Sequence, residues 1–230
     1  MTNPPRPAAA ARSVRLVGFG GHGREVLDCL RRAGADRADQ ALSVEVVHDR
    51  ERPDPVLLSR HRVTWEPGLP PDGVTAYLGI GSGRVRADLA PRTTAGLAVI
   101  DPAAAVGPTV TIGAGSIIFA GATVTVDITL GRHVHIGRGA AIGHDCEVGD
   151  FVTVLPLASV SGNVRIGAGT TIGTGALIRQ GVTIGANAFV GMGAVVLDDV
   201  PDDTTVVGVP ATPLRRNDAS THAGRQRRPR

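Results

Sequence analysis

Two ionisable residues, His144 and Asp145, stand together in the stretch AAIGHDCEVGDF, residues 140–151. A neutral imidazole is a good general base near neutral pH, and once protonated it can return its proton to a leaving group. An aspartate in a turn also forms hydrogen bonds to nearby backbone, so Asp145 has a structural interpretation as well. The pair predicts acid–base chemistry at His144. Beside it, Cys146 could act as a covalent nucleophile, although a cysteine in a strand usually packs in the core.

A glycine-rich segment lies near the beginning of the chain. GFGGHG, residues 18–23, fits GxGxxG between an expected strand and an expected helix. There, glycine lets the backbone approach a phosphate, and the helix end supplies free N–H groups. Asp49 provides an acidic residue at the end of the second strand, as nicotinamide-binding sheets require, but this part is too short for their two mononucleotide halves. We therefore expect phosphate binding without redox chemistry.

These two candidate sites lie in halves of the chain that have different periods. Between residues 14 and 101, short aliphatic strands alternate with helix-like segments. This alternation predicts a small α/β layer. The expected strands are 14–19, 43–49, 76–81 and 97–101, and the expected helix is 24–34.

From Val106 to Val196 an aliphatic residue returns at every sixth position without a slip, and glycine often follows it. A helix cannot keep such a stripe on one face. A parallel β-helix can, because each hexad forms one side of a three-sided coil and the aliphatic residues stack inside. With three hexads to a coil, the segment predicts about five coils.

The composition limits the classes of function. Aromatic residues make up 3% of the chain and glycine numbers 31 of 230 residues, which suits an aliphatic core with tight corners. The net charge is +3, and much of the positive charge falls in residues 215–230, which we expect to be a disordered basic tail and not a nucleic-acid-binding surface. Two cysteines without CxxC spacing fit a reducing, cytoplasmic location. No segment approaches the about 20 apolar residues of a membrane span, so membrane insertion and secretion are not expected.

Three features together carry a family resemblance: the hexad array, the closing segment GVTIGANAFVGMGAVVLDDVPDDTTVVGVPATPLRR and the amino-terminal LVGFGGHGREVL. Residues 14–216 resemble the hexapeptide-repeat acyltransferases, in the branch of the sialic-acid O-acetyltransferases and the bacillosamine-pathway N-acetyltransferases. The resemblance implies a Rossmann-like nucleotide-sugar-binding domain over 14–101 and a left-handed parallel β-helix over 102–214. It also implies a homotrimer about the coil axis.

The resemblance further implies roles for particular residues. In the family, the histidine of an HD or HE pair is the general base for direct transfer from acetyl-CoA, and the acidic residue orients it; His144 and Asp145 match these positions. The family's sugar-nucleotide contacts are matched by Gly20, Gly21, His22, Asp49, Gly81, Ser82 and Arg86. Its coenzyme A contacts are matched by Gly162, Gly173, Ala194, Pro210 and Arg215.

Several interpretations stay open at this point. Gly143 stands where many relatives carry glutamate, and Thr153 stands where many carry a second histidine, so the acceptor is not fixed. The acceptor implied first is a UDP- or dTDP-linked 4-amino sugar. The alternatives are O-acetylation of a sugar of the sialic-acid type and a non-catalytic, nucleotide-sugar-binding trimeric scaffold. Zinc carbonic anhydrases of the gamma type share the coil, but His133, His135 and His144 lack their HxxxxH spacing, so no metal is expected.

Overall fold

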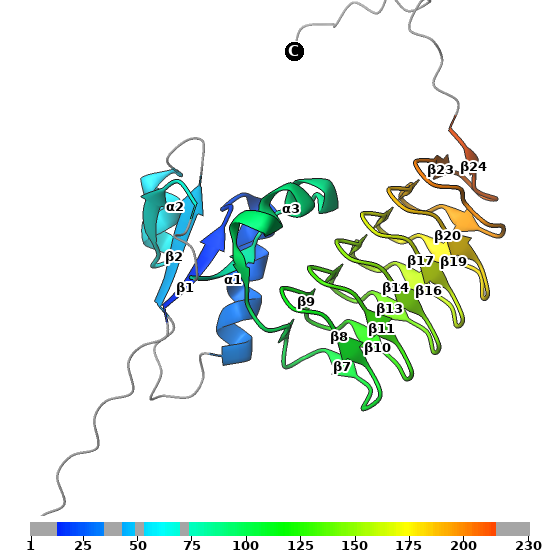
Figure 1. The fold of residues 1–230 in the computed structure, drawn as a ribbon, viewed down its shortest axis with the longest axis horizontal. Helices are drawn as coiled ribbons and strands as arrows, with labels where there is room; N and C mark the ends of the chain where they lie inside the picture. Colours follow the sequence, from blue (N-terminus) through cyan, green and yellow to red (C-terminus); the bar gives the residue numbers. More distant parts are fainter. Residues whose placement is uncertain (1–12, 35–42, 49–52, 70–73, 215–230) are drawn as a thin grey trace, which may run out of the picture.

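The computed structural model describes residues 13–34, 43–48, 53–69 and 74–214. Its amino-terminal part is a five-stranded parallel sheet in the order β3-β2-β1-β4-β5, with helices beside it (Figure 1). The elements in chain order are β1 (Ser13–Val17), α1 (Gly21–Gly34), β2 (Ser43–His48), α2 (Pro55–Arg60), β3 (Thr64–Pro67), β4 (Thr75–Leu78), α3 (Gly83–Leu89), the 3-10 turn η1 (Ala90–Arg92) and β5 (Thr94–Ala95).

The expected α/β pattern is confirmed for the strands at β1, β2 and β4, but α1 begins three residues before the expected start, at Gly21. The short helices α2 and α3 were not expected. Each begins at a capping side chain: Asp54 accepts from the N–H of Val56, and Ser82 accepts from the N–H of Val85. Such caps satisfy N–H groups that have no partner inside the helix.

The rest of the described chain is a parallel β-solenoid of the left-handed β-helix type, with three faces. The β13 face contains β7 (Ala105–Val106), β10 (Thr123–Val124), β13 (Ala141–Ile142), β16 (Ser159–Val160), β19 (Leu177–Ile178) and β22 (Val195–Val196). The β14 face contains β8 (Thr111–Ile112), β11 (Thr129–Leu130), β14 (Glu147–Val148), β17 (Arg165–Ile166) and β20 (Thr183–Ile184). The β12 face contains β6 (Val99–Ile100), β9 (Ile117–Ile118), β12 (His135–Ile136), β15 (Thr153–Val154), β18 (Thr171–Ile172), β21 (Phe189–Val190), β23 (Thr205–Val207) and β24 (Thr212–Pro213).

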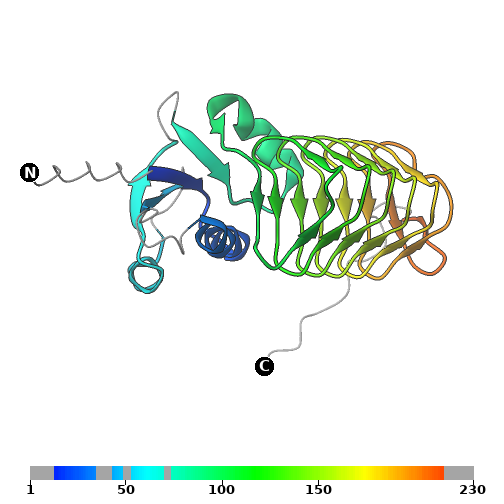
Figure 2. The ribbon, with the colours of Figure 1, turned by 90° about the horizontal axis from the view of Figure 1, so that it is seen from below.

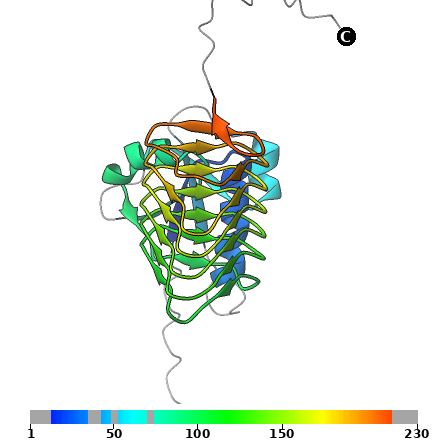
Figure 3. The same ribbon diagram turned by 90° about the vertical axis from the view of Figure 1, so that its right-hand side faces the viewer.

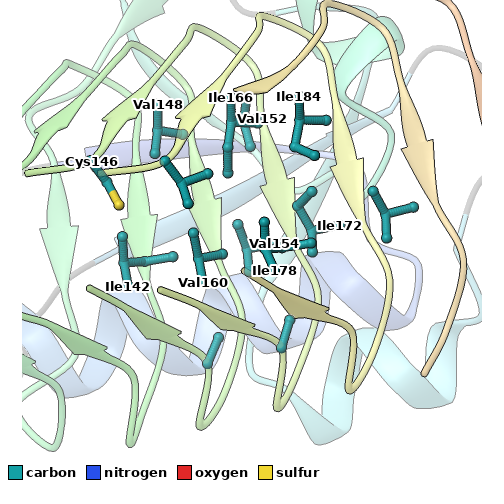
Figure 4. Packing of buried hydrophobic residues seen from close by; sticks show 14 of the residues in the cluster. Ile142, Cys146, Val148, Val152, Val154, Val160, Ile166, Ile172, Ile178 and Ile184 are labelled. Carbon is teal, nitrogen blue, oxygen red and sulfur yellow. The ribbon is translucent and has the colours of Figure 1, made fainter. Parts of the chain in front are cut away.

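The six-residue period is confirmed as the inward column of the coils. Figure 4 shows these side chains filling the interior, and Ile142, Val160 and Ile178 illustrate the column of the β13 face, each at most 2% exposed. Burial of one such aliphatic side chain contributes roughly 1.5–3 kcal/mol relative to exposure. Successive coils pair in parallel, as in Ala141 with Ser159, and lie one above the other (Figure 3).

The corners between faces require a residue with positive φ, three positions after an inward aliphatic residue. Glycine, asparagine and aspartate tolerate this conformation, and Asp145 adopts it with φ 58°. Bulkier residues occupy the corner before β12 and the corner before β15, where His133 has φ 53° and Phe151 has φ 62°. The corner role predicted for Asp145 is therefore present.

The two halves meet at the first coils. The segment 97–101, expected as the last strand of the α/β layer, instead pairs with β9 as β6 of the solenoid. Ile100 stands six residues before Val106, so the hexad phase already begins there. Helix α1 lies between the sheet and these coils (Figure 2), and buried residues of both halves form one hydrophobic cluster. None of the helices within the described residues is long and apolar enough to cross a membrane.

Candidate active site and substrate pocket

His144 and Asp145 form a hydrogen-bonded pair at the corner between β13 and β14. Nδ1 of His144 lies 2.6 Å from Oδ2 of Asp145, and both side chains are about half exposed, 52% and 53%. Since a carboxylate only accepts, Nδ1 donates to it, and in the neutral ring Nε2 then carries the free lone pair. This arrangement suits a general base that faces solvent.

The neighbouring coils hold the backbone of this corner on both sides. The N–H of Asp145 donates to the carbonyl of Val126 at 3.2 Å, and the N–H of Asn163 donates to the carbonyl of His144 at 2.8 Å. The inward position belongs to Ile142, so His144, two residues later, stands outside the aliphatic column.

Gly162, one of the expected coenzyme A contacts, lies in the next coil against the His144 ring. A β-carbon at Gly162 would be 2.5 Å from both Cε1 and Nε2 of that ring. Because Gly162 has no side chain, the imidazole of His144 can occupy this space.

Cys146 points into the solenoid core (Figure 4). It is 1% exposed, and its Sγ donates to the carbonyl of Ser161 at 3.2 Å. Burial raises the pKa of the thiol, which disfavours the thiolate that a covalent mechanism needs. These observations support packing as its role.

The glycine-rich segment leads from β1 into α1. Gly20 and Gly21 are exposed with open space beside them, and Gly23 packs so closely against the carbonyl of Gly18 that a side chain would not fit. The free N–H groups at the start of α1 are thus accessible to a ligand.

His22 lies in the first turn of α1, where the sequence indicates a loop. Its Nε2 lies 2.8 Å from Nδ1 of His135 in β12, and the two rings stack with centroids 5.0 Å apart. Burial, followed by the charge of Arg86, lowers the pKa of His22, and burial lowers the pKa of His135 well below its ordinary value. Both rings are therefore neutral at pH 7.

A cavity of about 300 Å³ opens at this contact between the two halves; we name it the junction cavity. The cavity is lined by residues of α1, by Phe119 directly after β9 and by residues of the next two coils, among them Gly21, His22, Glu25, His135, Arg138 and Thr153. The sequence points to His135 only as a possible metal ligand and gives no role to Glu25. Strand alternation could have indicated the covered face, because the residue before each inward aliphatic residue points outward. His135 and Ile117 stand at such outward positions, where a histidine or a large aliphatic residue indicates a face that another element covers.

The third loop, residues 79–82 between β4 and α3, contains the expected sugar contacts Gly81 and Ser82, and the expected contact Arg86 lies in α3. Gly81 lies beside His22, where a β-carbon would be 3.7 Å from the imidazole Cγ, and Ser82 is exposed as the cap of α3. Arg86, expected as a substrate contact, is 0% exposed and binds backbone carbonyls of both halves, so that prediction is wrong. Asp49 lies outside the described residues.

The other expected coenzyme A contacts are spread along the coils. Gly173 is buried directly against the next coil, where a β-carbon would be 2.6 Å from the N of Met192. Ala194 faces the core, and Pro210 is exposed after β23. Arg215 lies outside the described residues. A groove of about 630 Å³ runs over the β14 face, and β14 itself begins three residues after His144. No group of three His, Cys, Asp or Glu residues that could hold a metal ion occurs in the part of the chain that the structure describes.

Comparisons with known proteins identify the family. A model of the bacterial transferase hexapeptide (six repeats) matches residues 145–180 and 163–198. A search of curated protein sequences found no match. Among solved structures, the acetyltransferase domain of PglB from Neisseria gonorrhoeae is 32% identical with a TM-score of 0.74, and the match covers 88% of this chain and 100% of that chain. The same domain is also known in complex with acetyl coenzyme A, with 31% identity and a TM-score of 0.79.

Two further solved structures extend the match. A histidine-to-asparagine variant of perosamine N-acetyltransferase from Caulobacter crescentus, in complex with CoA and GDP-perosamine, is 28% identical with a TM-score of 0.78 and covers 89% of this chain and 97% of that chain. WeeI from Acinetobacter baumannii is 29% identical with a TM-score of 0.76, covering 87% and 99%. Together with the hexad coils and the exposed His144–Asp145 pair, these matches show that the chain belongs to the hexapeptide-repeat acyltransferases and is an acetyltransferase.

Proposed function

We propose that the enzyme transfers an acetyl group from acetyl-CoA to the amino group of a nucleotide-linked amino sugar, with His144 as general base. The observation that carries the proposal is the pair of His144 with Asp145: Nδ1 is bound to the carboxylate, and Nε2 lies at the open corner beside Gly162. Solved relatives in complexes with acetyl coenzyme A, and with CoA and GDP-perosamine, support the donor and the class of acceptor.

The proposed reaction is a direct transfer. His144 Nε2 takes a proton from the sugar amine as its nitrogen attacks the thioester carbonyl. The C–N bond forms, the C–S bond breaks, and the imidazolium returns the proton to the departing thiolate. The N–H of Gly162 takes part in none of the backbone hydrogen bonds among the described residues, which makes it a candidate donor to the developing oxyanion.

We propose the α/β layer, predicted over residues 14–101 and ending at β5 in the structure, as a Rossmann-like domain that binds the sugar nucleotide. The sheet order β3-β2-β1-β4-β5 supports this, as do the exposed Gly20 and Gly21 at the amino end of α1, where free N–H groups favour phosphate. The junction cavity, with His22 and the neighbouring Gly81, is the candidate pocket for the sugar. Ser82, exposed as the cap of α3, and Asp49 stay as predicted contacts.

We propose the solenoid, predicted over residues 102–214 and beginning at β6 in the structure, as the acyltransferase domain that binds coenzyme A along its coils. Gly162 lies against the His144 ring, so a donor bound at this glycine would lie next to the base. The groove on the β14 face offers a path for the pantetheine arm. The further proposed contacts are Gly173, Ala194, Pro210 and Arg215.

The proposed assembly is a homotrimer, in which a second copy supplies the other wall of the groove. The β13 face supports this, because its outward column holds Ser159, Leu177 and Val195 and no charged residue, and Leu177 is 48% exposed. The proposed compartment is the cytosol, since Cys29 and Cys146 are both free thiols.

The experiment is a thiol-release assay with acetyl-CoA against UDP-, GDP- and dTDP-linked amino sugars and free sialic acid. We expect release with one amino-sugar nucleotide and a loss of at least roughly 10²-fold in His144→Ala, because the base is removed. The matched control is His61→Ala, which removes another partly buried histidine that lies away from the corner. Unchanged turnover in His144→Ala would overturn the assignment of the base. Release with sialic acid alone would indicate O-acetylation, and a protein that binds no coenzyme A would be a scaffold.

A further inference from the structure

Arg86 in α3 is a charged side chain that the fold buries completely. It is 0% exposed, and all three nitrogens of its guanidinium are engaged. No ion pair among the described residues includes it. Its partners are five carbonyl oxygens and one hydroxyl at 2.8–3.2 Å: Ile80, Gly81, His133, Phe151 and Val152, with Oγ1 of Thr153.

These partners belong to both halves of the molecule. Ile80 and Gly81 form the loop between β4 and α3, whereas His133 and the run 151–153 belong to two successive coils. Carbonyl dipoles thus compensate a buried charge that would be costly without partners. Burial lowers the pKa of Arg86 to about 9, which leaves the guanidinium charged at neutral pH. One side chain therefore ties the third loop of the α/β layer to the solenoid.

The coil corners that Arg86 contacts are unusual. Equivalent corners one coil before and after carry Gly115 and Gly169, but here His133 and Phe151 occupy the positive-φ position. Their rings stack with centroids 5.3 Å apart and an angle of 6° between planes. Bulky residues adopt this conformation only at an energetic cost. The bonds from Arg86 to both corner carbonyls contribute to holding this geometry.

Two further contacts at the same place leave no space between α3 and the coil. Gly83 lies so close to the carbonyl of Phe151 that a side chain would not fit. Oγ1 of Thr153 donates to the carbonyl of Gly81 at 3.0 Å while it accepts from Arg86. The position of the loop is therefore set by direct contact and not by the chain connection alone.

The loop held in this way lies against the proposed substrate pocket. Gly81 faces the His22 ring, and His22 in turn binds His135 across the junction cavity. Thr153 lines the same cavity. A shift of the third loop would therefore change the shape of the cavity, while the corner of His144 with Asp145 and Gly162 would keep its own coil contacts.

We propose that Arg86 is a positioning residue, which locks the α/β layer onto the coils and so sets the sugar-nucleotide pocket relative to His144 without touching substrate. This inference rests on the proposed function. In this proposal Arg86 takes part neither in acid–base chemistry nor in coenzyme A binding. Its loss therefore acts on the acceptor side of the reaction.

The test compares Arg86→Lys with Arg84→Lys, a matched change at an exposed position of the same helix. An ammonium has three donors and cannot reach six acceptors in a planar arrangement. We expect the KM for the sugar nucleotide to rise about tenfold in Arg86→Lys, with the KM for acetyl-CoA changed by less than about twofold. Free guanidinium should partly restore Arg86→Ala, and methylammonium should not. Thr153→Val provides a milder loss if Arg86→Ala does not fold.

Hydrogen–deuterium exchange at residues 79–82 and 21–24, without substrate, separates this inference from the proposed function. Faster exchange in Arg86→Lys alone supports positioning, even if the wild type acetylates none of the sugars offered. A folded Arg86→Lys with unchanged exchange and unchanged KM would overturn it. Equal changes in both KM values would also overturn it, because they would indicate a general loss of structure.

Discussion

The imidazole of His144 lies against the α-carbon of Gly162, one coil further along the chain. A β-carbon there would be 2.5 Å from Cε1 and Nε2 of the ring and 3.0 Å from Cδ2. Gly162 is not among the residues with positive φ, so the corner itself does not require glycine at this position. The position of the His144 ring does. The candidate base can thus keep its position only if residue 162 is glycine.

Gly162→Ala should therefore lower kcat by about 10²-fold, because the added methyl group displaces the ring from its place beside the proposed thioester. The change should leave the unfolding temperature close to that of the wild type, since the backbone conformation suits alanine. Steady-state kinetics and a coenzyme A titration check this. The control is Gly34→Ala, where a β-carbon meets open space. Full kcat in Gly162→Ala would show that the ring position does not matter.

Asp145→Asn separates the charge of the carboxylate from its corner role. Asparagine tolerates the positive φ of 58°, so the coil should stay intact, whereas the hydrogen bond that orients His144 becomes weaker and uncharged. We expect kcat to fall about tenfold with unchanged stability. Asp127→Asn makes the same change at the equivalent corner one coil earlier, with φ 56°, and should have no effect on kcat. Equal activity in both variants would assign Asp145 to the corner alone.

The sequence predicts the solenoid well because one physical rule repeats along it. A side chain every sixth position must be aliphatic to fill the coil, and this requirement continues through Ile142 and Val160 without interruption. Ile100 belongs to the same six-residue period, and β6 indeed pairs with β9 of the solenoid. Its segment is also compatible with a strand of the α/β layer, which is why the sequence alone does not assign it. The candidate base is predictable for the complementary reason: His144 falls outside the column.

The contacts between the halves are not predictable in this way. Arg86 binds carbonyls 47 and 65 residues further along the chain, and backbone acceptors have no signature in residue type. From the sequence alone, an arginine beside a glycine-rich loop is interpreted as a ligand contact, because the sequence does not show which coil carbonyls it binds. His22 and His135, separated by 113 residues, likewise become neighbours only when α1 packs on the coils.

Cys146→Ala should retain activity within about twofold, because direct transfer needs no thiol on the enzyme. The thiol is 1% exposed, and burial raises its pKa, so it should also resist alkylation in the folded protein. Turnover of the variant and mass spectrometry after brief treatment with iodoacetamide check both points. Loss of activity with intact coils, together with an acetylated Cys146 in the wild type, would instead indicate a covalent intermediate.

The buried histidines at the junction predict how stability depends on pH. Burial, then the charge of Arg86, lowers the pKa of His133 to about 4, and the same causes lower the pKa of His22 and His135. In the unfolded chain these groups titrate near 6.5, so the unfolded state binds more protons below that pH. The free energy of unfolding should be constant above about pH 7 and should fall as the pH drops toward 4, by about 1.4 kcal/mol per pH unit for each histidine that takes up a proton only on unfolding.

Urea unfolding of the wild type and of His133→Asn between about pH 7 and pH 5 measures this slope. Asparagine keeps the positive φ of the corner, so the variant removes the titrating ring while it preserves the coil. A shallower slope in His133→Asn is the expected result, because one proton fewer is taken up on unfolding. An identical slope would mean that His133 is already protonated in the folded protein. A protonated His133 would place a second positive charge next to Arg86, which binds the His133 carbonyl. Arg86 is buried and has no counter-ion among the described residues, so this second charge is unfavourable.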